Sequence, residues 1–418
     1  MAGEHVPSNV GLGDWNSGAG SAVGLKRADR PRDPVYMPQL DALRFLAVLG
    51  VLVAHNWHPR RLPWLLGDLD WGGLGVRLFF VLSGFLITGI LVDCRSMADQ
   101  GLGSSRFYVR RFYARRFLRI FPLYYFVIAV ALVVDFPPTR DVWVWLVTYT
   151  TNIYVTVIQA WPGRLGHFWT LAVEEQFYLV WPWLILYAPR KWLVPIMLFA
   201  IAQAPVYRLW AYTRFPFDIG AMDFKAGTLT LASLDALGVG SLIALLWRSL
   251  QKEVLQWWLA KVVLPVGVVV YVIALALYHY RIKPSVFFVA CDLGVALIFA
   301  WLVSSAARGF GGVIGRALEF GPLVYLGKIT YGIYVYHYFV PPLLRFMLDR
   351  VGVAYSYPNF SSFVLSSLVT LAIASVSWHA FELPINKLKN RFKYRPQAEI
   401  DATVRANIVL PRVSERAT

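Results

Sequence analysis

Mainly apolar runs, each about twenty residues long, recur between short polar or basic segments from residue 38 to residue 381. A helical run of this length covers the hydrocarbon core of a bilayer. The pattern therefore predicts an all-α, polytopic membrane helix bundle. The candidate membrane segments are residues 38–58, 73–93, 117–136, 142–158, 168–188, 192–211, 227–247, 259–279, 284–305, 322–344 and 361–381.

The distribution of Lys and Arg indicates how these segments cross, because cytoplasmic loops carry the excess of positive charge. Segment 142–158 is the most polar of the set. If it does not cross, the cytoplasmic parts hold 22 Lys and Arg and the outer loops 10; if it crosses, the split is 17 to 15. The count favours about ten spans with both termini cytoplasmic, and a re-entrant or interfacial helix at 142–158.

The composition excludes an ordinary soluble protein. Hydrophobic residues make up 58% of the 418 residues and charged residues only 15%, and the mean hydropathy is +0.53. The net charge of +16 is concentrated in loops and tails, which indicates anionic lipid headgroups and topology signals before nucleic acid. Cys94 and Cys291 lie far apart and indicate neither a disulfide framework nor a metal cluster.

The same patterns divide the chain into three parts. Residues 1–35 are rich in Gly, Ser, Pro and charge without an apolar core, which predicts a disordered cytoplasmic tail and no signal peptide. Residues 36–390 hold the membrane segments, and residues 391–418 are predicted to form a basic cytoplasmic tail.

The first membrane segment, 38–58, carries three ionisable residues within an apolar helix. Asp41 and Arg44 lie near one end and His55 near the other. Charged groups at membrane depth are costly and indicate function. Arg44 and His55 are eleven residues apart, so they share a helix face about 16 Å apart along the axis. We interpret this stripe as lining a path between the two membrane surfaces.

A basic run at residues 106–125 contains six arginines and no acidic residue. An amphipathic helix on anionic headgroups explains most of them. Arg116 and Arg119, however, continue into the next span on a shared face. Guanidinium groups suit phosphates. The pair is therefore a candidate site for a phosphate-bearing ligand on the cytoplasmic side, against the alternative of lipid contact alone.

Further ionisable residues lie inside later segments. Arg77 is one turn inside a glycine-rich span, where snorkelling towards the surface is the alternative to a role in a site. His167 and Glu174 share a helix face, and Glu175 lies about 100° away. The alternative to a role in the site is structural: these carboxylates would pair with Arg77 or Arg44 and hold helices together.

Other polar residues are, one by one, more typical of helix–helix contacts than of catalysis. Together they predict a bundle with a polar interior. They are Asp235, Asp292, Lys328, His337, His379 and Glu382, and no metal-binding, P-loop, G-x-S-x-G or G-x-G-x-x-G motif accompanies them.

Five ordered motifs resemble those of the acyltransferase-3 family of integral-membrane O-acyltransferases. They are LDALRFLAVLGVLVAHNW, LFFVLSGFLI, RRFLRIFPLYY, HFWTLAVEEQFYLVWP and YGIYVYH, and their order and spacing fit across about residues 38–390. The resemblance implies that 36–390 is a membrane acyltransferase domain. It implies an acyl-CoA donor, most often acetyl-CoA, on the cytoplasmic side. It implies a hydroxyl acceptor on a polysaccharide, glycoconjugate or small glycoside, and the inner membrane of a bacterium.

The resemblance also implies roles for individual residues. The family's essential histidine falls on His55, its first-span arginine on Arg44, and its R-x-x-R pair on Arg116 and Arg119. The acidic residue before a proline in the last span falls on Glu382. The long H-x-W motif falls on His167, Trp169, Glu174, Phe177 and Tyr178.

The chain departs from the family pattern at three positions. Thr170 stands where serine is usual, and Ala42 replaces a frequent glycine. Ser233 stands two residues before Asp235, where arginine is frequent, which leaves the partner of Asp235 open. No extracellular hydrolase-like domain is expected after the last span, which tilts the expectation from large cell-wall polymers towards a polysaccharide precursor, an exopolysaccharide unit or a small glycoside.

The expected mechanism follows from the stripe and the basic residues. CoA phosphates would bind Arg116 and Arg119, with Arg44, and the thioester would approach His55 from inside. His55 would act as general base on the acceptor hydroxyl, or would carry the acyl group itself. Glu174 or Glu175 would fix the imidazole tautomer. Arg77 is a candidate donor to the oxyanion. The residues expected at the substrate are Arg77, His167, Trp169, Tyr178, His337 and Glu382.

Two other classes of function remain open at this point. A polar interior with intramembrane carboxylates also suits an ion-coupled transporter or a lipid-linked glycan flippase. The R-x-x-R pair joined to a first-span histidine is not required by transport and favours the enzyme. A non-catalytic partner of a polysaccharide assembly complex is the third possibility. Retention of the motif residues argues against it.

Overall fold

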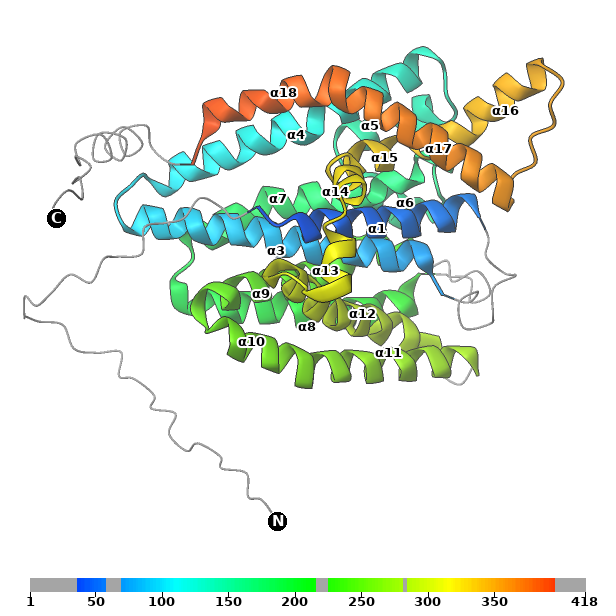
Figure 1. The fold of residues 1–418 in the computed structure, drawn as a ribbon. Helices are drawn as coiled ribbons and strands as arrows, with labels where there is room; N and C mark the ends of the chain where they lie inside the picture. The colour runs from blue at the N-terminus through cyan, green and yellow to red at the C-terminus, as the bar shows by residue number, and fades with distance from the viewer. Residues whose placement is uncertain (1–35, 58–68, 216–224, 281–283, 395–418) are drawn as a thin grey trace, which may run out of the picture. The chain divides into compact units, whose positions relative to one another are not determined.

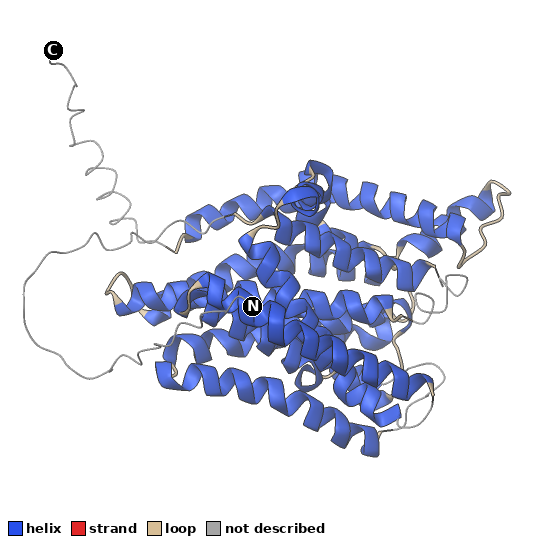
Figure 2. Cartoon of the chain, turned by 60° about the horizontal axis from the view of Figure 1, so that its bottom comes forward, coloured by secondary structure: helices blue, strands red, loops and turns tan. Residues whose placement is uncertain are grey.

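The described residues of the computed structural model, 36–57, 69–215, 225–280 and 284–394, fold into helices joined by short turns (Figures 1 and 2). No strand occurs in these ranges. The helical class inferred from the apolar runs is confirmed. The tail predicted at 1–35 and most of the tail predicted at 391–418 lie outside the described residues.

Two helices that follow each other in the chain form the middle of the bundle (Figure 1). They are α1 (Pro38–Asn56) and α3 (Trp71–Asp99), and α3 packs extensively on α9 (Thr230–Ser249). A Cβ atom added to Gly84 would lie 2.1 Å from the Leu237 carbonyl oxygen. One added to Gly240 would lie 2.1 Å from the Val81 carbonyl oxygen. Glycine is therefore required where the α3 and α9 backbones touch.

The other helices surround this pair. On one side lie α4 (Ser105–Val133) and the C-terminal helices that contact it, and on the other α8 (Arg190–Arg214) and α10 to α12 (Figure 1). The remaining elements are α7 (Trp169–Tyr187), α10 (Lys252–Trp258), η3 (Leu259–Val263), α11 (Leu264–His279), α12 (Pro284–Arg308), α13 (Gly312–Leu318), α17 (Phe360–Ser377), η4 (Trp378–Glu382), α18 (Leu383–Lys387) and η5 (Leu388–Phe392).

Eight helices of the described part are long and apolar enough to cross a membrane. The segment 142–158 is not one of them, because it is divided between α5 (Thr139–Val147) and α6 (Thr151–Ile158). Nine residues of helix span only about 13 Å.

The prediction of a single helix over residues 322–344 is wrong. The chain there forms α14 (Gly321–Lys328), α15 (Thr330–Tyr336) and α16 (Val340–Arg350). A Cβ atom at Gly327 would lie 1.9 Å from the Asp41 carbonyl oxygen, so α14 packs backbone to backbone on α1. The two prolines that open α16 start a new helix. The breaks let one segment contact α1, α4 and α17 in turn.

Candidate active site

Three histidines from distant parts of the chain meet near the C-terminal end of α1. His55 belongs to α1, His167 to the 3-10 turn η1 (Gly163–Phe168), and His337 directly follows α15. His55 Nδ1 lies 2.9 Å from His337 Nε2. The ring centroids of His167 and His337 are 5.0 Å apart. The sequence singled out each ring, and the structure brings them together.

The hydrogen bonds of this cluster assign the ring protons. His337 Nδ1 lies 2.6 Å from the Tyr334 carbonyl oxygen, and a carbonyl oxygen only accepts, so Nδ1 carries a hydrogen. In a neutral His337 the other nitrogen, Nε2, then accepts. His55 Nδ1 therefore donates to His337, and Nε2 is the basic nitrogen of His55.

Burial keeps the two partner rings neutral. His337 is fully buried and His167 is 3% exposed, and no described carboxylate bonds either ring. A buried cation without a partner is strongly disfavoured. Desolvation, aided by the nearby His337 and His55 rings, lowers the pKa of His167 well below its ordinary value. His167 Nδ1 donates to the Arg164 carbonyl oxygen at 2.9 Å, and its Nε2 is buried without a described partner.

Aromatic and hydroxyl groups enclose the rings. Tyr338 stacks on His55 with centroids 4.2 Å apart, and the Tyr357 hydroxyl donates to the His55 carbonyl oxygen. Thr170 Oγ1 donates to the His167 carbonyl oxygen at 3.1 Å and bonds the Tyr334 hydroxyl at 2.5 Å. Threonine here supplies the hydroxyl that the usual serine would supply, so this departure from the family pattern keeps the contact.

The carboxylates expected beside His55 lie in a separate cluster. Glu174 accepts a hydrogen bond from Ser83 Oγ, which also accepts one from the Tyr178 hydroxyl at 3.1 Å. The His55 ring contacts His337 of the first cluster. The contact with His337 adds a histidine to the residues that can orient the His55 ring, and the role predicted for Glu174 or Glu175 stays a prediction. Glu175 Oε1 is buried without a described partner.

The basic residues predicted to bind phosphate gather around this second cluster. The Arg116 guanidinium lies over the Tyr178 ring at 5.2 Å, and Arg116 and Arg44 both attract the Glu174 carboxylate. Arg119 is close enough to Arg44 and Arg116 for their charges to act on it. Arg44 also pairs with Asp41. The charges of three arginines, one of α1 and two of α4, thus act on one another in this region.

Two further predicted residues, Glu382 and Trp169, have described contacts of their own. Glu382 accepts a hydrogen bond from Ser377 Oγ at 3.0 Å, and the positive charge of Arg119 acts on its carboxylate. Trp169 packs edge-on against Phe80 of α3, with ring centroids 6.2 Å apart.

Arg77 does not join either cluster through a described bond. It pairs with Asp292 of α12 and lies 3.9 Å from Asp235, and Arg208 bonds Asp235 at 2.7 Å and approaches Asp292 at 3.5 Å. These four charges tie α3, α8, α9 and α12 together, so the structural explanation of Arg77 is favoured over substrate binding. Arg208, 1% exposed, is the partner of Asp235 that sequence reasoning missed, because no local motif marks it near the end of segment 192–211.

Comparison with known proteins gives consistent matches. A family model of an acyltransferase domain matches residues 37–379. The peptidoglycan O-acetyltransferase OatA of Listeria monocytogenes is 28% identical over 377 residues, 84% of this chain and 56% of that protein. The O-acetyltransferase OatA of Staphylococcus aureus is 26% identical over 396 residues, 87% of this chain and 59% of that protein. The putative peptidoglycan O-acetyltransferase YrhL of Bacillus subtilis is 26% identical over 380 residues, 84% and 55%.

The chain therefore spans less than two thirds of the length of these relatives. No solved structure matches it. The family match includes His55, the R-x-x-R pair and both later histidines, and it confirms the resemblance inferred from the five motifs. The chain belongs to the acyltransferase-3 family.

Proposed function

We propose that this protein is a membrane O-acetyltransferase that moves an acetyl group from acetyl-CoA to a hydroxyl of a glycan. The single observation that carries the proposal is the bond between His55 Nδ1 and His337 Nε2, which leaves His55 Nε2 as a base. Relatives that are 28% and 26% identical are named O-acetyltransferases, which supports the proposal. The family match and these relatives favour an enzyme over the transporter alternative.

The donor is proposed to bind at the basic end of the site. Arg116, Arg119 and Arg44 offer guanidinium groups to the CoA phosphates. Arg44 and His55 lie on one helix, eleven positions apart, which is about 16 Å along the axis. The pantetheine arm would bridge this distance along α1 and present the thioester carbonyl to His55.

Two chemical routes fit the same residues. In the direct route, His55 Nε2 takes the proton of the acceptor hydroxyl, whose oxygen attacks the thioester carbonyl and expels the CoA thiolate. The imidazolium then returns a proton to the thiolate. In the two-step route, His55 Nε2 attacks the thioester carbonyl, expels the CoA thiolate and carries the acetyl group as an acetyl-imidazolium. The acceptor oxygen then attacks the acetyl carbon and releases the neutral imidazole, and the hydroxyl proton passes to the CoA thiolate.

The acceptor and the membrane arrangement complete the proposal. Two of the relatives carry peptidoglycan in their names, which makes a cell-wall glycan an acceptor to test beside an exopolysaccharide unit or a small glycoside.

We place the protein in a bacterial cell membrane with ten spans: the eight candidate helices, α7, and the segment α14–α16. Both termini and the basic start of α4 would face the cytoplasm, with His55 towards the outer side.

The test uses His55→Ala in membranes with [¹⁴C]acetyl-CoA and a mixed glycan acceptor. General-base loss predicts a fall in acetyl transfer of about 10²- to 10⁴-fold. His379→Ala, which removes an exposed histidine outside the cluster, is the matched control and should keep activity. Wild-type transfer by a normally inserted His55→Ala protein would refute the proposal. Label retained on wild-type protein without acceptor, and lost in His55→Ala, selects the two-step route.

A further inference from the structure

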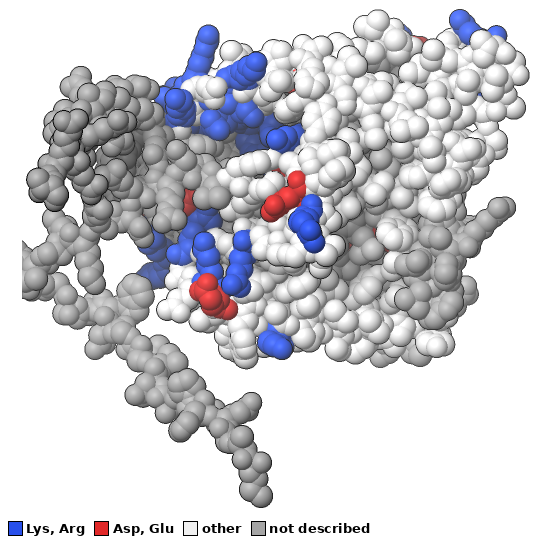
Figure 3. All heavy atoms as spheres, in the orientation of Figure 1, with Lys and Arg blue, Asp and Glu red and all other residues white. Residues whose placement is uncertain are grey.

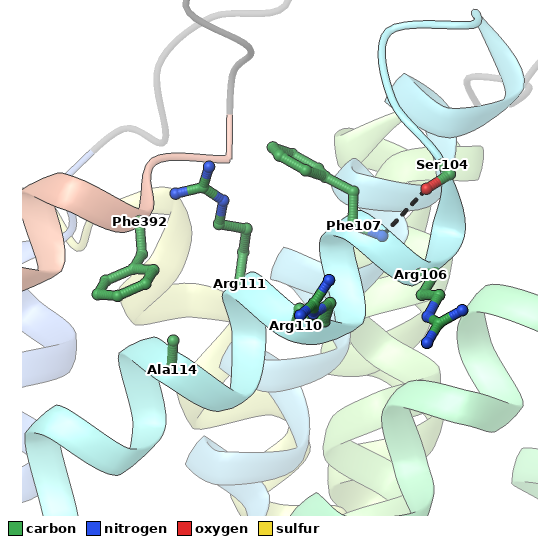
Figure 4. Close-up of a pocket in the computed structure, with 7 residues that line it drawn as sticks. All are labelled: Ser104, Arg106, Phe107, Arg110, Arg111, Ala114 and Phe392. Atoms are coloured by element: carbon green, nitrogen blue, oxygen red, sulfur yellow. Dashed lines mark hydrogen bonds between the residues drawn. The ribbon is translucent and has the colours of Figure 1, made fainter.

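A surface groove lies where the start of α4 meets the C-terminal turn η5. It has a volume of about 530 Å³ (Figure 4). Figure 4 shows Phe107 and Phe392 on either side of the Arg111 guanidinium. The lining residues are Ser104, Arg106, Phe107, Arg110, Arg111, Ala114 and Phe392, with three arginines and no carboxylate among them.

The six arginines of α4 divide into three pairs by their contacts. Arg116 and Arg119 belong to the interior cluster described above. Arg111 Nη1 donates to the Arg391 carbonyl oxygen at 2.6 Å, and Arg115 Nη1 donates to the Lys389 carbonyl oxygen at 3.0 Å. These two arginines hold η5 against α4 by binding its terminal carbonyl groups. The third pair, Arg106 and Arg110, is exposed and makes no hydrogen bond or ion pair within the described residues.

The packing of these two segments brings like charges together. α4 carries six arginines, residues 383–394 add four cations, and neither segment contains Asp or Glu. Lys and Arg side chains gather at this end of the molecule in the view of Figure 3. Such repulsion is relieved by a bound anion, and a groove at the junction with two uncommitted guanidinium groups is suited to one.

The helical geometry decides what kind of anion fits. Successive residues of a helix turn by about 100°, so Arg106, Arg110, Ala114 and Phe117 form one stripe. Arg116 and Arg119 point about 120° or more away from Arg110. Arg106 and Arg110 therefore lie on a different face of α4 from the inner pair. The stripe is cationic at the start of a candidate membrane span and apolar further along, where Phe117 is 53% exposed.

We propose that the groove binds one anionic phospholipid from the cytoplasmic leaflet. Its headgroup phosphate would contact Arg106, Arg110 and the Arg111 edge, and an acyl chain would follow Ala114 and Phe117 into the bilayer. The bound lipid offsets the repulsion between α4 and η5. It thereby steadies the α4 arginines that face the interior. The proposal does not depend on the reaction that the protein catalyses.

The test measures lipid retention and thermal stability of purified protein in nanodiscs of phosphatidylcholine with or without phosphatidylglycerol. Wild-type protein should retain one phosphatidylglycerol in native mass spectrometry and should be stabilised by it. The double variant Arg106→Gln/Arg110→Gln should bind this lipid about 30-fold more weakly. The control Lys387→Gln/Lys393→Gln removes two exposed cations of the neighbouring segment that do not line the groove, and should retain the lipid.

A second variant distinguishes lipid binding in the groove from general attraction of lipid by positive surface charge. Ala114→Trp fills the groove and leaves every arginine in place, so it should abolish retention of the single lipid. Full retention by Ala114→Trp, or equal losses in the double variant and the lysine control, would overturn the proposal. Stabilisation by glycerol phosphate or inorganic phosphate equal to that by the lipid would also overturn it, because the acyl chain would then contribute nothing.

Discussion

The hydrogen bond between His55 and His337 predicts a catalytic effect of replacing His337, which acts through the His55 ring. Replacing His337 with Phe keeps a planar ring of similar size and removes the acceptor for the His55 Nδ1 hydrogen. The His55 imidazole is then free to change tautomer or to rotate. Its basic Nε2 would no longer be presented to the acceptor in every molecule.

The magnitude follows from the bond that is lost. A neutral hydrogen bond at 2.9 Å contributes about 0.5–1.5 kcal/mol, and a buried donor left without a partner costs about 1–3 kcal/mol. Since 1.4 kcal/mol corresponds to a factor of ten, we expect kcat to fall by about 10- to 100-fold. That loss is smaller than the upper range expected for removing the base itself, about 10⁴-fold.

The assay measures initial rates of acetyl transfer in proteoliposomes while acetyl-CoA is varied. His337→Phe should lower kcat and leave the KM for acetyl-CoA unchanged, because the proposed donor arginines lie at the other end of the α1 stripe. His337→Gln can offer an amide oxygen to His55 and should recover most of the rate. His379→Phe is the matched control for a histidine-to-phenylalanine change on the exposed surface.

Wild-type kcat in a folded His337→Phe protein would show that the tautomer argument is wrong. A rise in the KM for acetyl-CoA in proportion to the fall in kcat would equally contradict it, because a donor-binding role would then explain the effect. A failure of His337→Gln to recover activity would point to packing and not to hydrogen bonding.

Three other predictions follow from the described contacts. Arg116→Gln or Arg119→Gln should raise the KM for acetyl-CoA by about 10- to 100-fold, the loss of one charged hydrogen bond, and kinetics with saturating acceptor would measure it. Asp235→Asn removes the nearer of the two carboxylates that pair with buried Arg208 and leaves Asp292 at 3.5 Å, so it should lower the free energy of unfolding by about 1.5–3 kcal/mol in a denaturation assay. His167 has a lowered pKa, so the unfolded state takes up its proton first as pH falls below about 6.5. Between pH 7.5 and 5.5 its contribution to stability should therefore fall by about 1.4 kcal/mol, and thermal unfolding of His167→Gln should lack this part of the acid destabilisation. An unchanged KM, an unchanged midpoint and an unchanged pH slope would contradict these three statements respectively.

The arginines of α4 make different contacts, which explains why one helix carries six like charges. Two arginines of this helix face the interior cluster, and two bind the carbonyl groups of η5. Arginine is suited to both tasks, because its planar guanidinium offers several donors and stays charged at any physiological pH. The two remaining arginines mark the groove, which the positive-inside rule alone would have treated as unspecific surface charge.

Several properties of this protein were determined by local features of the chain. Apolar runs of membrane-crossing length predicted the helical bundle, because the bilayer sets that length. The motifs around His55, Arg116 and His167 were sufficient to indicate the family, because each lies within a short stretch. Arg44 and His55 could be placed on one helix face, since their relation depends only on the helical repeat.

Other properties required the folded chain. His55 and His337 are 282 residues apart, and Arg208 reaches Asp235 from another helix, so no local pattern predicts either contact. Membrane helices are apolar on nearly all sides, and their hydropathy therefore does not show which faces meet. Close packing at glycines such as Gly84 sets those faces. The same packing places the His337 imidazole against His55 and Glu174 of α7 beside Ser83.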